Sequence, residues 1–340
     1  MNFLFFGLGS IGQRHVRNLI KIKKKSKIFA YRKKYSTPLL NHKNEKIKGD
    51  VEKKYNIVAI KKLEFFKNNN IKIDAAFICN PSNMHVSTAE WCIKKNIPIF
   101  VEKPVATNMN DLKKIQKLLK FKNKLINVVG YQLRFNPIIR FIKKYIFDQE
   151  KLGKIYNCEI YHGEHIDNFH SYESYKNSYT SKKKLGGGVS LTQIHELDYL
   201  NYFFDRYNLL DTKYISQKIS KLKINVEDNY VSIFKYKSKL KKNISLAKIT
   251  CTFLQVPKKR TIFISCEFGS IYADLNNSKV KILRPKKKEV IKKFNFYRND
   301  MFVNEIKNFL DLIENKGKKK ILPSIKEDSF VNNLAIKIKV

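Results

Sequence analysis

Three glycines near the start of the chain have the spacing of a phosphate-binding turn. Gly7, Gly9 and Gly12 follow the apolar run 3–6 as G-x-G-x-x-G, and a helical pattern begins immediately after them. Gly7 would permit a tight turn, and Gly9 would let the backbone approach a pyrophosphate. Gly12 would let the helix lie close to the sheet, with its first N–H groups directed at the phosphates. Strand, glycine turn and helix together favour a dinucleotide site over a glycine-rich turn without a ligand.

The residues after the second expected strand, 27–31, bear on the choice of dinucleotide. An acid at this point is typical of NAD sites, because it binds the ribose hydroxyls. Here Arg32 and Lys33 follow the strand, and no acid occurs before Glu45. Arg32 can stack on adenine and Lys33 can meet a 2′-phosphate, which favours NADP(H) over NAD(H). The alternative is that both cations belong to a general excess of lysine.

Polar motifs follow two further expected strands. The run 73–79 leads into NPSNMH at 80–85, and the run 98–101 leads into EKP at 102–104. Ligands of doubly wound sheets bind at the carboxyl ends of the strands, so both motifs are expected to face the cofactor. A Glu and a Lys at such an edge are costly to bury unless they are paired or used.

The elements that would position these motifs alternate along the first 130 residues. Strand and helix in alternation predict a parallel sheet with helices on both faces. From about residue 153 the pattern changes to longer alternating strands, which predict an open, mostly antiparallel sheet with one polar face. The expected strands are 2–6, 27–31, 56–60, 73–79, 98–101, 125–130, 154–166, 229–237, 244–256 and 260–275, and the expected helices are 11–25, 84–95, 108–122, 191–204 and 299–315.

Composition limits the classes of function. The 340 residues carry a formal charge of +40, which by itself suggests nucleic acid. However, the basic residues are sixty lysines and nine arginines spread along the whole chain, without zinc-finger spacing or an RNP-type aromatic run. We therefore expect a solvated basic surface and no specific nucleic-acid partner, although the field can attract anionic substrates.

Cysteine and histidine spacing gives no sign of a metal or disulfide framework. The five cysteines are isolated, without C-x-x-C spacing, as in a reducing cytosol. The histidines around 162–195 follow no ligand pattern, so we expect no metal. No apolar stretch approaches the length of a membrane span, and the glycine turn begins too early for a signal peptide. We expect a cytoplasmic protein without a membrane partner.

The chain resembles the Gfo/Idh/MocA oxidoreductases, that is, glucose–fructose oxidoreductase, inositol dehydrogenase and their relatives. The motifs that carry the resemblance occur in order, at the family's intervals, over nearly the whole chain. They are GLGSIG at 7–12, NPSNMH at 80–85, EKP at 102–104, GYQLRFNP at 130–137 and GGGVSLTQIHELDYL at 186–200.

The resemblance implies two catalytic residues. Lys103 would lie beside the nicotinamide and polarise the substrate oxygen, and His195 would exchange the hydroxyl proton. On sequence alone, Lys103 could instead pair with Glu102, and a helical His is more often a packed residue. The residues expected at the cofactor are Gly7, Gly9, Ser10, Ile11, Gly12, Arg32, Lys33, Asn80, Pro81, His85, Glu102 and Lys103.

One position departs from the family pattern. Many relatives have an Asp shortly before the histidine, whereas Thr192 is the nearest candidate here. A Thr can hydrogen-bond a hydroxyl but cannot serve as a base. Either His195 works alone, titrating near the free value of about 6.5, or this chain handles its substrate differently. Asp198 could cap or orient the histidine.

A segment before the triple glycine is rich in Tyr, His and Lys and is typical of a substrate loop. Tyr175 and Tyr179 are its candidate substrate contacts, unless they are chance aromatics of a surface loop. Arg134, in GYQLRF, could meet a substrate carboxylate or phosphate, or only an acid between the domains. The expected substrate residues are Arg134, Tyr175, Tyr179, Thr192 and His195.

Together these features predict two domains and a tail. Residues 1–128 would form a Rossmann domain, residues 129–323 an α+β domain for substrate binding and oligomerisation, and residues 324–340 a segment that could return to the first domain. The expected activity is hydride transfer between NAD(P) and a secondary hydroxyl or keto group of a sugar, sugar nucleotide or cyclitol. Motif likeness to certain relatives suggests surface-glycan sugar synthesis as its setting. The alternative is a catalytically silent cofactor-binding sensor or assembly subunit. An open sheet face favours a homodimer or homotetramer.

Overall fold

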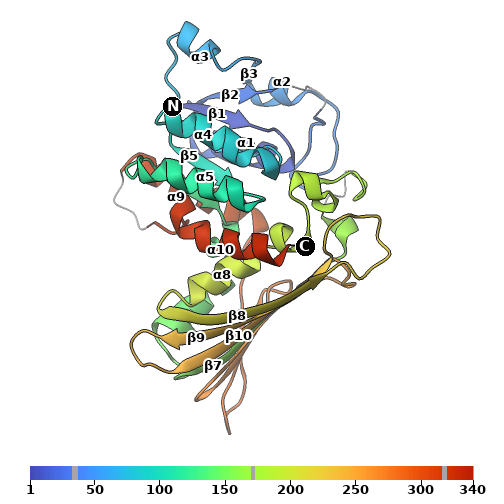
Figure 1. Cartoon of the computed structure of the whole chain (residues 1–340), viewed down its shortest axis with the longest axis vertical. Coiled ribbons are helices and arrows are strands. Elements are labelled where there is room, and N and C mark those ends of the chain that lie inside the picture. Colours follow the sequence, from blue (N-terminus) through green and yellow to red (C-terminus); the bar gives the residue numbers. More distant parts are fainter. Residues whose placement is uncertain (33–36, 170–172, 316–319, 340) are drawn as a thin grey trace.

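A parallel sheet forms the first domain of the computed structural model, which describes residues 1–32, 37–169, 173–315 and 320–339. Six strands run parallel in the order β3-β2-β1-β4-β5-β6 (Figure 1). The order in which successive strands join the sheet therefore reverses between β1 and β4. All six expected strands are present, and the predicted doubly wound sheet is confirmed. The strands are β1 (Asn2–Phe6), β2 (Lys27–Tyr31), β3 (Ile57–Ile60), β4 (Ala75–Ile78), β5 (Ile99–Glu102) and β6 (Asn127–Gly130).

Helices cover both faces of this sheet. The burial of Val16 and Leu19 on α1 shows which side of that helix faces the sheet. Phe309 of α9 packs edge-on against Phe77 and Phe100, with ring centroids 5.6 and 5.8 Å apart. The α-helices are α1 (Ser10–Ile22), α2 (Val51–Tyr55), α3 (Phe65–Asn68), α4 (His85–Lys94), α5 (Met109–Lys120), α6 (Pro137–Ile142), α7 (Val189–Thr192), α8 (His195–Phe203), α9 (Arg298–Ile313) and α10 (Ile325–Ile338). Shorter helical segments are η1 (Ser82–Met84), η2 (Gln132–Phe135), η3 (Lys143–Asp148), η4 (Ile166–Asn168), η5 (Tyr179–Ser181) and η6 (Lys183–Leu185).

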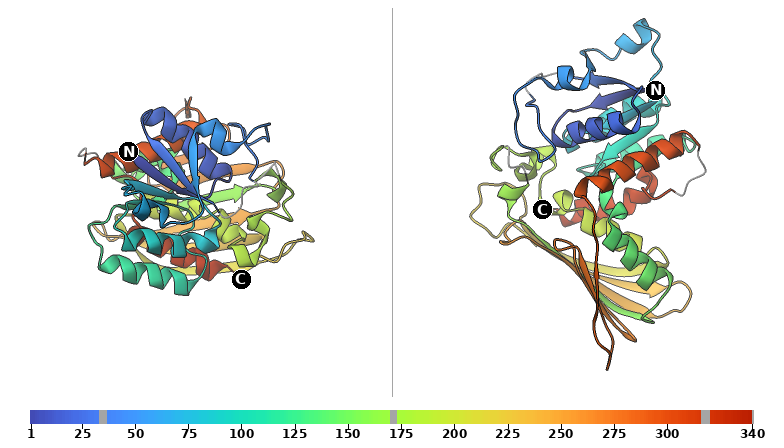
Figure 2. Two further views of the ribbon diagram at one scale, coloured as in Figure 1. Left: turned by 90° about the horizontal axis from the view of Figure 1, so that it is seen from above. Right: turned by 180° about the vertical axis from the view of Figure 1, so that it is seen from behind.

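The second domain is a sheet in the order β14-β13-β12-β11-β7-β10-β9-β8. Its pairs are antiparallel except β7 with β10, so the predicted mostly antiparallel sheet is confirmed. In Figure 2, helices lie between this sheet and the first domain. Phe204, just after α8, stacks on Tyr236 of β9 with centroids 4.2 Å apart. The strands are β7 (Ile155–Gly163), β8 (Tyr207–Gln217), β9 (Asn229–Ser238), β10 (Ile244–Thr252), β11 (Lys259–Cys266), β12 (Gly269–Asp274), β13 (Lys279–Leu283) and β14 (Val290–Lys293).

Three local differences separate the structure from the sequence-based prediction. The expected strand 260–275 is the hairpin β11–β12, turned around residues 267 and 268. The expected helix 191–204 is broken at Gln193 into α7 and α8, and β8, β13 and β14 were not predicted. The expected helix 299–315 is α9, which packs on α1 and the first sheet, although the predicted boundary at 323 assigns it to the second domain.

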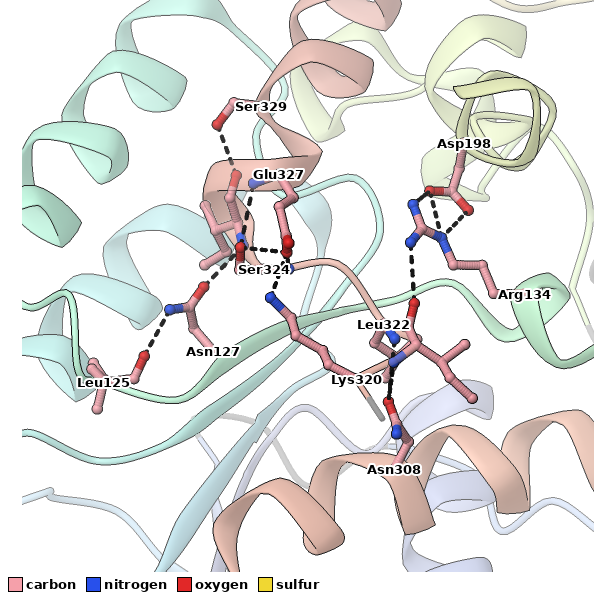
Figure 3. A network of polar contacts seen from close by, with 12 residues as sticks. Leu125, Asn127, Arg134, Asp198, Asn308, Lys320, Leu322, Ser324, Glu327 and Ser329 are labelled. Atoms are coloured by element: carbon pink, nitrogen blue, oxygen red, sulfur yellow. Dashed lines mark hydrogen bonds and ion pairs between the residues drawn. The ribbon is translucent and has the colours of Figure 1, made fainter. Parts of the chain in front are cut away.

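The segment before α10 joins both domains (Figure 3). Asn308 of α9 accepts hydrogen bonds from the backbone of Ile321 and Leu322 at 3.1 and 3.2 Å. Ser324 and Glu327 then form a capping box that begins α10. This helix packs on α5 and β6 of the first domain and on α7 and α8 of the second. Within the described residues, no helix is both long and apolar enough to cross a membrane.

Candidate active site

The glycine turn after β1 has the shape that a bound pyrophosphate requires. Gly7 has a φ of +95°, and a Cβ there would lie 2.6 Å from the backbone nitrogen of Asn80. Packing therefore explains Gly7, and Gly12 similarly lies against the carbonyl of Gly7. Gly9 differs, because no heavy atom of the described chain lies within 4 Å of the position a Cβ would take. Gly9, the N-cap residue of α1, makes no side-chain capping hydrogen bond. Open space beside the first N–H groups of the helix fits a phosphate ligand.

The turn after β4 is held by His85. Its Nδ1 lies 2.8 Å from the carbonyl oxygen of Pro104, and its Nε2 lies 2.8 Å from that of Asn80. A neutral ring can donate to only one of these two acceptors. His85 is 1% exposed, so it joins the turns after β4 and β5, while Pro81 is exposed at the same edge. The Asn80 side chain donates to the Thr88 hydroxyl at 2.9 Å.

At the adenosine end, the structure adds an acid that sequence reasoning missed. The Arg32 guanidinium forms an ion pair with Glu52 of α2 and donates to the Thr37 hydroxyl at 3.1 Å. Lys33, the expected partner of a 2′-phosphate, lies outside the described residues. Glu52 stands twenty-one residues after β2 ends, whereas a ribose-binding acid typically lies at the end of that strand, so no sequence signal pointed to it.

Lys103 stands at the end of β5 and reaches the second domain. Its Nζ donates to the backbone carbonyl of Thr192 at 2.9 Å. Burial lowers the pKa of Lys103, while the charges of Glu102 and Glu196 act in the opposite direction. Glu102 does not pair with the Lys103 amine, because its Oε1 is 2.7 Å from His15 Nε2. Lys103 is therefore available to a substrate oxygen with Thr192 as its neighbour.

His195 begins α8 and is 7% exposed. Its Nε2 lies 3.2 Å from the side-chain nitrogen of Gln132. Burial, followed by the charges of Lys103 and Arg260, lowers the pKa of His195 well below its ordinary value. The expectation that it titrates near the free value is therefore wrong. The physical reason is that a cationic imidazole there would be desolvated beside two further cations.

A buried ion cluster behind His195 was not found from the sequence. Glu196 accepts from Arg260 Nε at 2.8 Å, and His162 Nδ1 lies 3.1 Å from the same carboxylate oxygen. Burial is the largest influence and would raise the pKa of Glu196, but the charges of Arg260 and His162 together with the His162 hydrogen bond outweigh it and lower that pKa well below its ordinary value. The three residues come from α8, β11 and β7, so only the fold brings them together.

Some of the expected substrate residues lie near Lys103, and others, such as Arg134, make structural contacts elsewhere. The Arg134 guanidinium grips Asp198 at 2.7 to 3.1 Å and also donates to the carbonyl of Ile321 (Figure 3). Asp198 therefore pairs with Arg134 and not with His195. Arg134 is an ion-pair partner of Asp198, and no substrate contact is proposed for it. Thr192 offers its carbonyl to Lys103, and its buried hydroxyl makes no hydrogen bond within the described residues. Tyr175 lines a cavity described below.

One buried cluster has spacing that would suit a metal ion. The nearest ligand atoms of His15, Glu102 and Glu305 all lie within 4.8 Å of one another. Burial, and then the neighbouring Glu102 charge, raise the pKa of Glu305 well above its ordinary value. A protonated carboxyl is a poor metal ligand. The absence of a metal from this protein stays a prediction.

Comparison with known proteins agrees with this geometry. Residues 1–131 match the model of the Gfo/Idh/MocA oxidoreductase family, described as an NAD-binding Rossmann fold. The match covers 131 of the 340 residues and places the likeness to the family in the N-terminal part of the chain. The resemblance carried by the sequence motifs is thus confirmed, and the chain contains the NAD(P)-binding domain of an oxidoreductase family.

Solved structures extend the likeness of fold beyond the Gfo/Idh/MocA domain. A levoglucosan dehydrogenase in complex with NADH matches with a TM-score of 0.79 at 14% identity, over 99% of this chain and 95% of that one. UDP-N-acetylglucosamine 3-dehydrogenase from Acidithiobacillus ferrooxidans matches with a TM-score of 0.73 at 14% identity, over 99% and 96%. Biliverdin reductase from Synechocystis, in complex with biliverdin and NADP+, gives 0.73 at 12% identity, over 99% and 97%. The TM-scores over nearly the whole length of each chain show a shared two-domain fold, and at these low identities the likeness is one of fold alone.

Proposed function

We propose that this chain is an NAD(P)-dependent oxidoreductase that acts on a secondary hydroxyl or keto group of a sugar, sugar nucleotide or cyclitol. The observation that carries the proposal is the meeting of Lys103 Nζ with the Thr192 carbonyl at 2.9 Å, because it brings the ends of β5 and α7 together beside His195. The named sugar dehydrogenases of the same fold support the substrate class. A role in surface-glycan synthesis belongs to the same proposal.

The glycine turn and the start of α1 would hold the cofactor pyrophosphate. Bound NAD(P) supplies the hydride acceptor in the oxidation direction and the hydride donor in reduction. The edge formed by Asn80, Pro81 and Lys103 would face its nicotinamide half. We also propose NADP(H) as the preferred form, because Arg32 and Lys33 follow β2. The ion pair between Glu52 and Arg32 opposes this preference, because it neutralises the charge that would attract the 2′-phosphate.

Lys103 and His195 would divide the acid–base work. In oxidation the substrate carbon loses a hydride and its hydroxyl loses a proton, which leaves a carbonyl. A cationic Lys103 amine would stabilise the negative charge that develops on that oxygen. His195 would accept the proton, since its lowered pKa keeps the imidazole neutral and unprotonated near pH 7.

The test follows reduced nicotinamide by absorbance over a panel of sugars, sugar nucleotides and cyclitols. Lys103→Ala and His195→Ala are each expected to lower kcat by about 100-fold or more, the usual scale for positioned acid–base groups. Exposed residues provide matched controls, Lys95→Ala and His42→Ala, which should leave kcat unchanged. Trp91, the single tryptophan, packs against Phe6 and reports cofactor binding by fluorescence. Cofactor binding with no turnover on any compound would instead support the silent cofactor-binding subunit.

A further inference from the structure

A cavity of about 440 Å³ lies beside the expected substrate loop, outside the groups that surround Lys103. One wall carries His165, Tyr175 and Lys176, and the other carries Lys221 and Lys223. Leu222 and Leu254 give it an apolar part. Its volume lies within the range of ligand pockets, and its lining combines one aromatic ring, two leucines and several cations around a space that is open to solvent.

The charge of the cavity has one sign. Its lining includes three lysines and a histidine, and among the described residues it includes no carboxylate. Lys176, Lys221 and Lys223 are exposed and form no ion pair within the described part of the chain. Two acids contact the lining from outside it: Asp167 lies 3.4 Å from His165 Nδ1, and the buried Asp228 accepts from the Ser220 hydroxyl at 2.6 Å. Three like charges around one concavity repel each other, and an anion placed among them removes that repulsion.

The lysine-bearing wall has a fixed frame. Asp228, which is fully buried, accepts from the backbone nitrogens of Ile219 and Ser220 at 2.9 and 3.1 Å. It also accepts from the Ser220 hydroxyl at 2.6 Å, and that hydroxyl accepts from the Leu222 nitrogen at 3.1 Å. These bonds set the course of the backbone that carries Lys221.

The two walls are joined to each other. The backbone nitrogen of Lys223 donates to the Tyr175 hydroxyl at 3.4 Å. Tyr175 therefore contributes its ring to the cavity while its hydroxyl is bonded to the opposite wall. A preorganised frame lowers the cost of ordering a bound ligand.

The cavity opens at the same edge of the second sheet as His195. His165 follows β7 and Leu254 follows β10, and these two strands are a parallel pair whose carboxyl ends lie together. Thr252, at the end of β10, accepts from the Gln193 side chain at 3.3 Å. Gln193 stands between Thr192 and His195, so the cavity and the proposed catalytic groups share one supporting strand end.

We propose that this cavity binds the diphosphate of a nucleoside-diphosphate sugar whose sugar ring reacts at Lys103 and His195. The inference rests on the proposed function and narrows its substrate class. Lysine ammonium groups bind phosphate oxygens through charge-assisted hydrogen bonds. The Tyr175 ring and the two leucines would contact the apolar faces of the nucleoside. An uncharged monosaccharide would leave the three lysines without a counter-charge.

Binding of UDP and of uridine, measured by equilibrium dialysis at near-physiological salt with saturating NADH, tests the proposal. Saturation with NADH occupies the cofactor's own pyrophosphate site and separates the two sources of diphosphate binding. The parent protein should bind UDP and should not retain uridine. Lys176→Ala/Lys221→Ala/Lys223→Ala should weaken UDP binding by about tenfold or more, since each lost bond to a charged group exceeds 1 kcal/mol on the usual scale.

The matched control is Lys287→Ala/Lys288→Ala/Lys293→Ala, which removes three exposed lysines near β14 and the same net charge. It should change UDP affinity by less than about twofold, because surface charges separated by more than a Debye length are screened. NADH binding, reported by Trp91, checks that both triple variants remain folded.

Three results would overturn the proposal. Equal losses in both triple variants would assign UDP binding to the general field, and UDP retention that NADH abolishes in the parent would assign it to the cofactor site. Turnover of an uncharged sugar without UDP binding would remove the diphosphate site and leave the proposed function intact. UDP binding lost in the pocket variant, without turnover of any sugar nucleotide, would support the cavity and remove the proposed catalysis.

Discussion

His195 carries the sharpest prediction at the scale of single residues, because its surroundings disfavour the imidazolium. In the oxidation direction the neutral ring is the active form, so the rate should fall on acidification through the pKa of His195. Burial, Lys103 and Arg260 lower that pKa, and the acidic limb should therefore lie well below about 6.5, the free value. A pH profile of kcat with a verified substrate measures this limb.

A charge variant checks the cause of that shift. Arg260→Gln removes a neighbouring cation and releases Glu196, which should raise the pKa of His195 and move the acidic limb upward. Lys95→Ala, far from the site on α4, should leave the limb in place. An acidic limb at or above 6.5 in the parent would contradict this account of His195.

Glu52 gives a prediction about the choice of cofactor. It neutralises Arg32 beside the expected adenosine ribose. Glu52→Gln should free the guanidinium for a 2′-phosphate and strengthen NADPH binding relative to NADH by about tenfold, the scale of one charge-assisted bond. Fluorescence titration with both reduced cofactors measures the ratio, with Glu45→Gln, at an exposed acid between β2 and α2, as the control. An unchanged ratio would mean that Arg32 does not reach the cofactor.

Sequence motifs predicted which candidate residues lie at strand ends, because the topology of a doubly wound sheet brings those ends together. Gly7, Gly12 and Lys103 therefore lie where the motifs predicted. The partners of these groups were not predictable in the same way. Arg260 joins Glu196 across 64 positions, and Arg134 meets Asp198 across another 64. Such pairs depend on how distant segments of the chain pack together, and no local pattern predicts them.

At the scale of elements, α10 connects the two domains through a buried acid. The Tyr131 hydroxyl, after β6, donates to Asp328 Oδ1 at 2.7 Å. Burial raises the pKa of Asp328 from 3.8 to about 7. The folded protein therefore binds a proton more tightly than the unfolded chain does. The contribution to stability is full below pH 3.8 and is lost as pH rises towards 7, by about 4 kcal/mol in total.

Urea unfolding between pH 4 and 8 tests this contribution. Asp328→Asn should remove the decline in stability that is linked to this proton. The free energy of unfolding of the variant, relative to that of the parent, should therefore increase as pH rises. Asp167→Asn, at a more exposed acid, should track the parent. Parallel curves for Asp328→Asn and the parent would show that Asp328 is ionised in the folded state.

The accuracy of the element prediction follows the burial of each segment. The first sheet is buried on both faces, and its continuous apolar runs marked all six strands. The break at Gln193 could not be predicted from the sequence, because α7 and α8 are both buried and their residues together have the pattern of one continuous apolar helix. β8 and β14 were missed because exposed polar residues interrupt their alternation. The hairpin β11–β12 was merged because its turn, Glu267-Phe268, has none of the usual turn residues.

At the scale of the whole molecule, the outer face of the second sheet predicts self-association. Ile215, Ile233, Leu246 and Phe263 share this face and are 78, 50, 48 and 36% exposed. Such a patch is typical of a subunit interface. The parent should therefore be a dimer or tetramer at micromolar concentration. Ile233→Lys, near the centre of the patch, should dissociate it by burying a charge in the interface.

Light scattering of both proteins measures the mass. Leu240→Lys provides the control, since this equally apolar and 78% exposed residue lies in the β9–β10 turn and away from the patch. A monomeric parent would contradict the prediction, and an unchanged oligomer in Ile233→Lys would move the interface elsewhere.

Because α9 and α10 pack on the first domain, this domain can complete its folding only late in the synthesis of the chain. Phe309 covers Phe77 and Phe100, and Asn332 of α10 bonds to both backbone groups of Ala106. A ribosome that has released residues 1–131 has therefore made every strand of the Rossmann sheet but not α9 and α10, which cover part of it. Removal of one such phenylalanine contact typically costs about 3 to 5 kcal/mol. The nascent first domain must wait, with part of its apolar surface open to chaperones, until some 200 further residues of the chain have emerged.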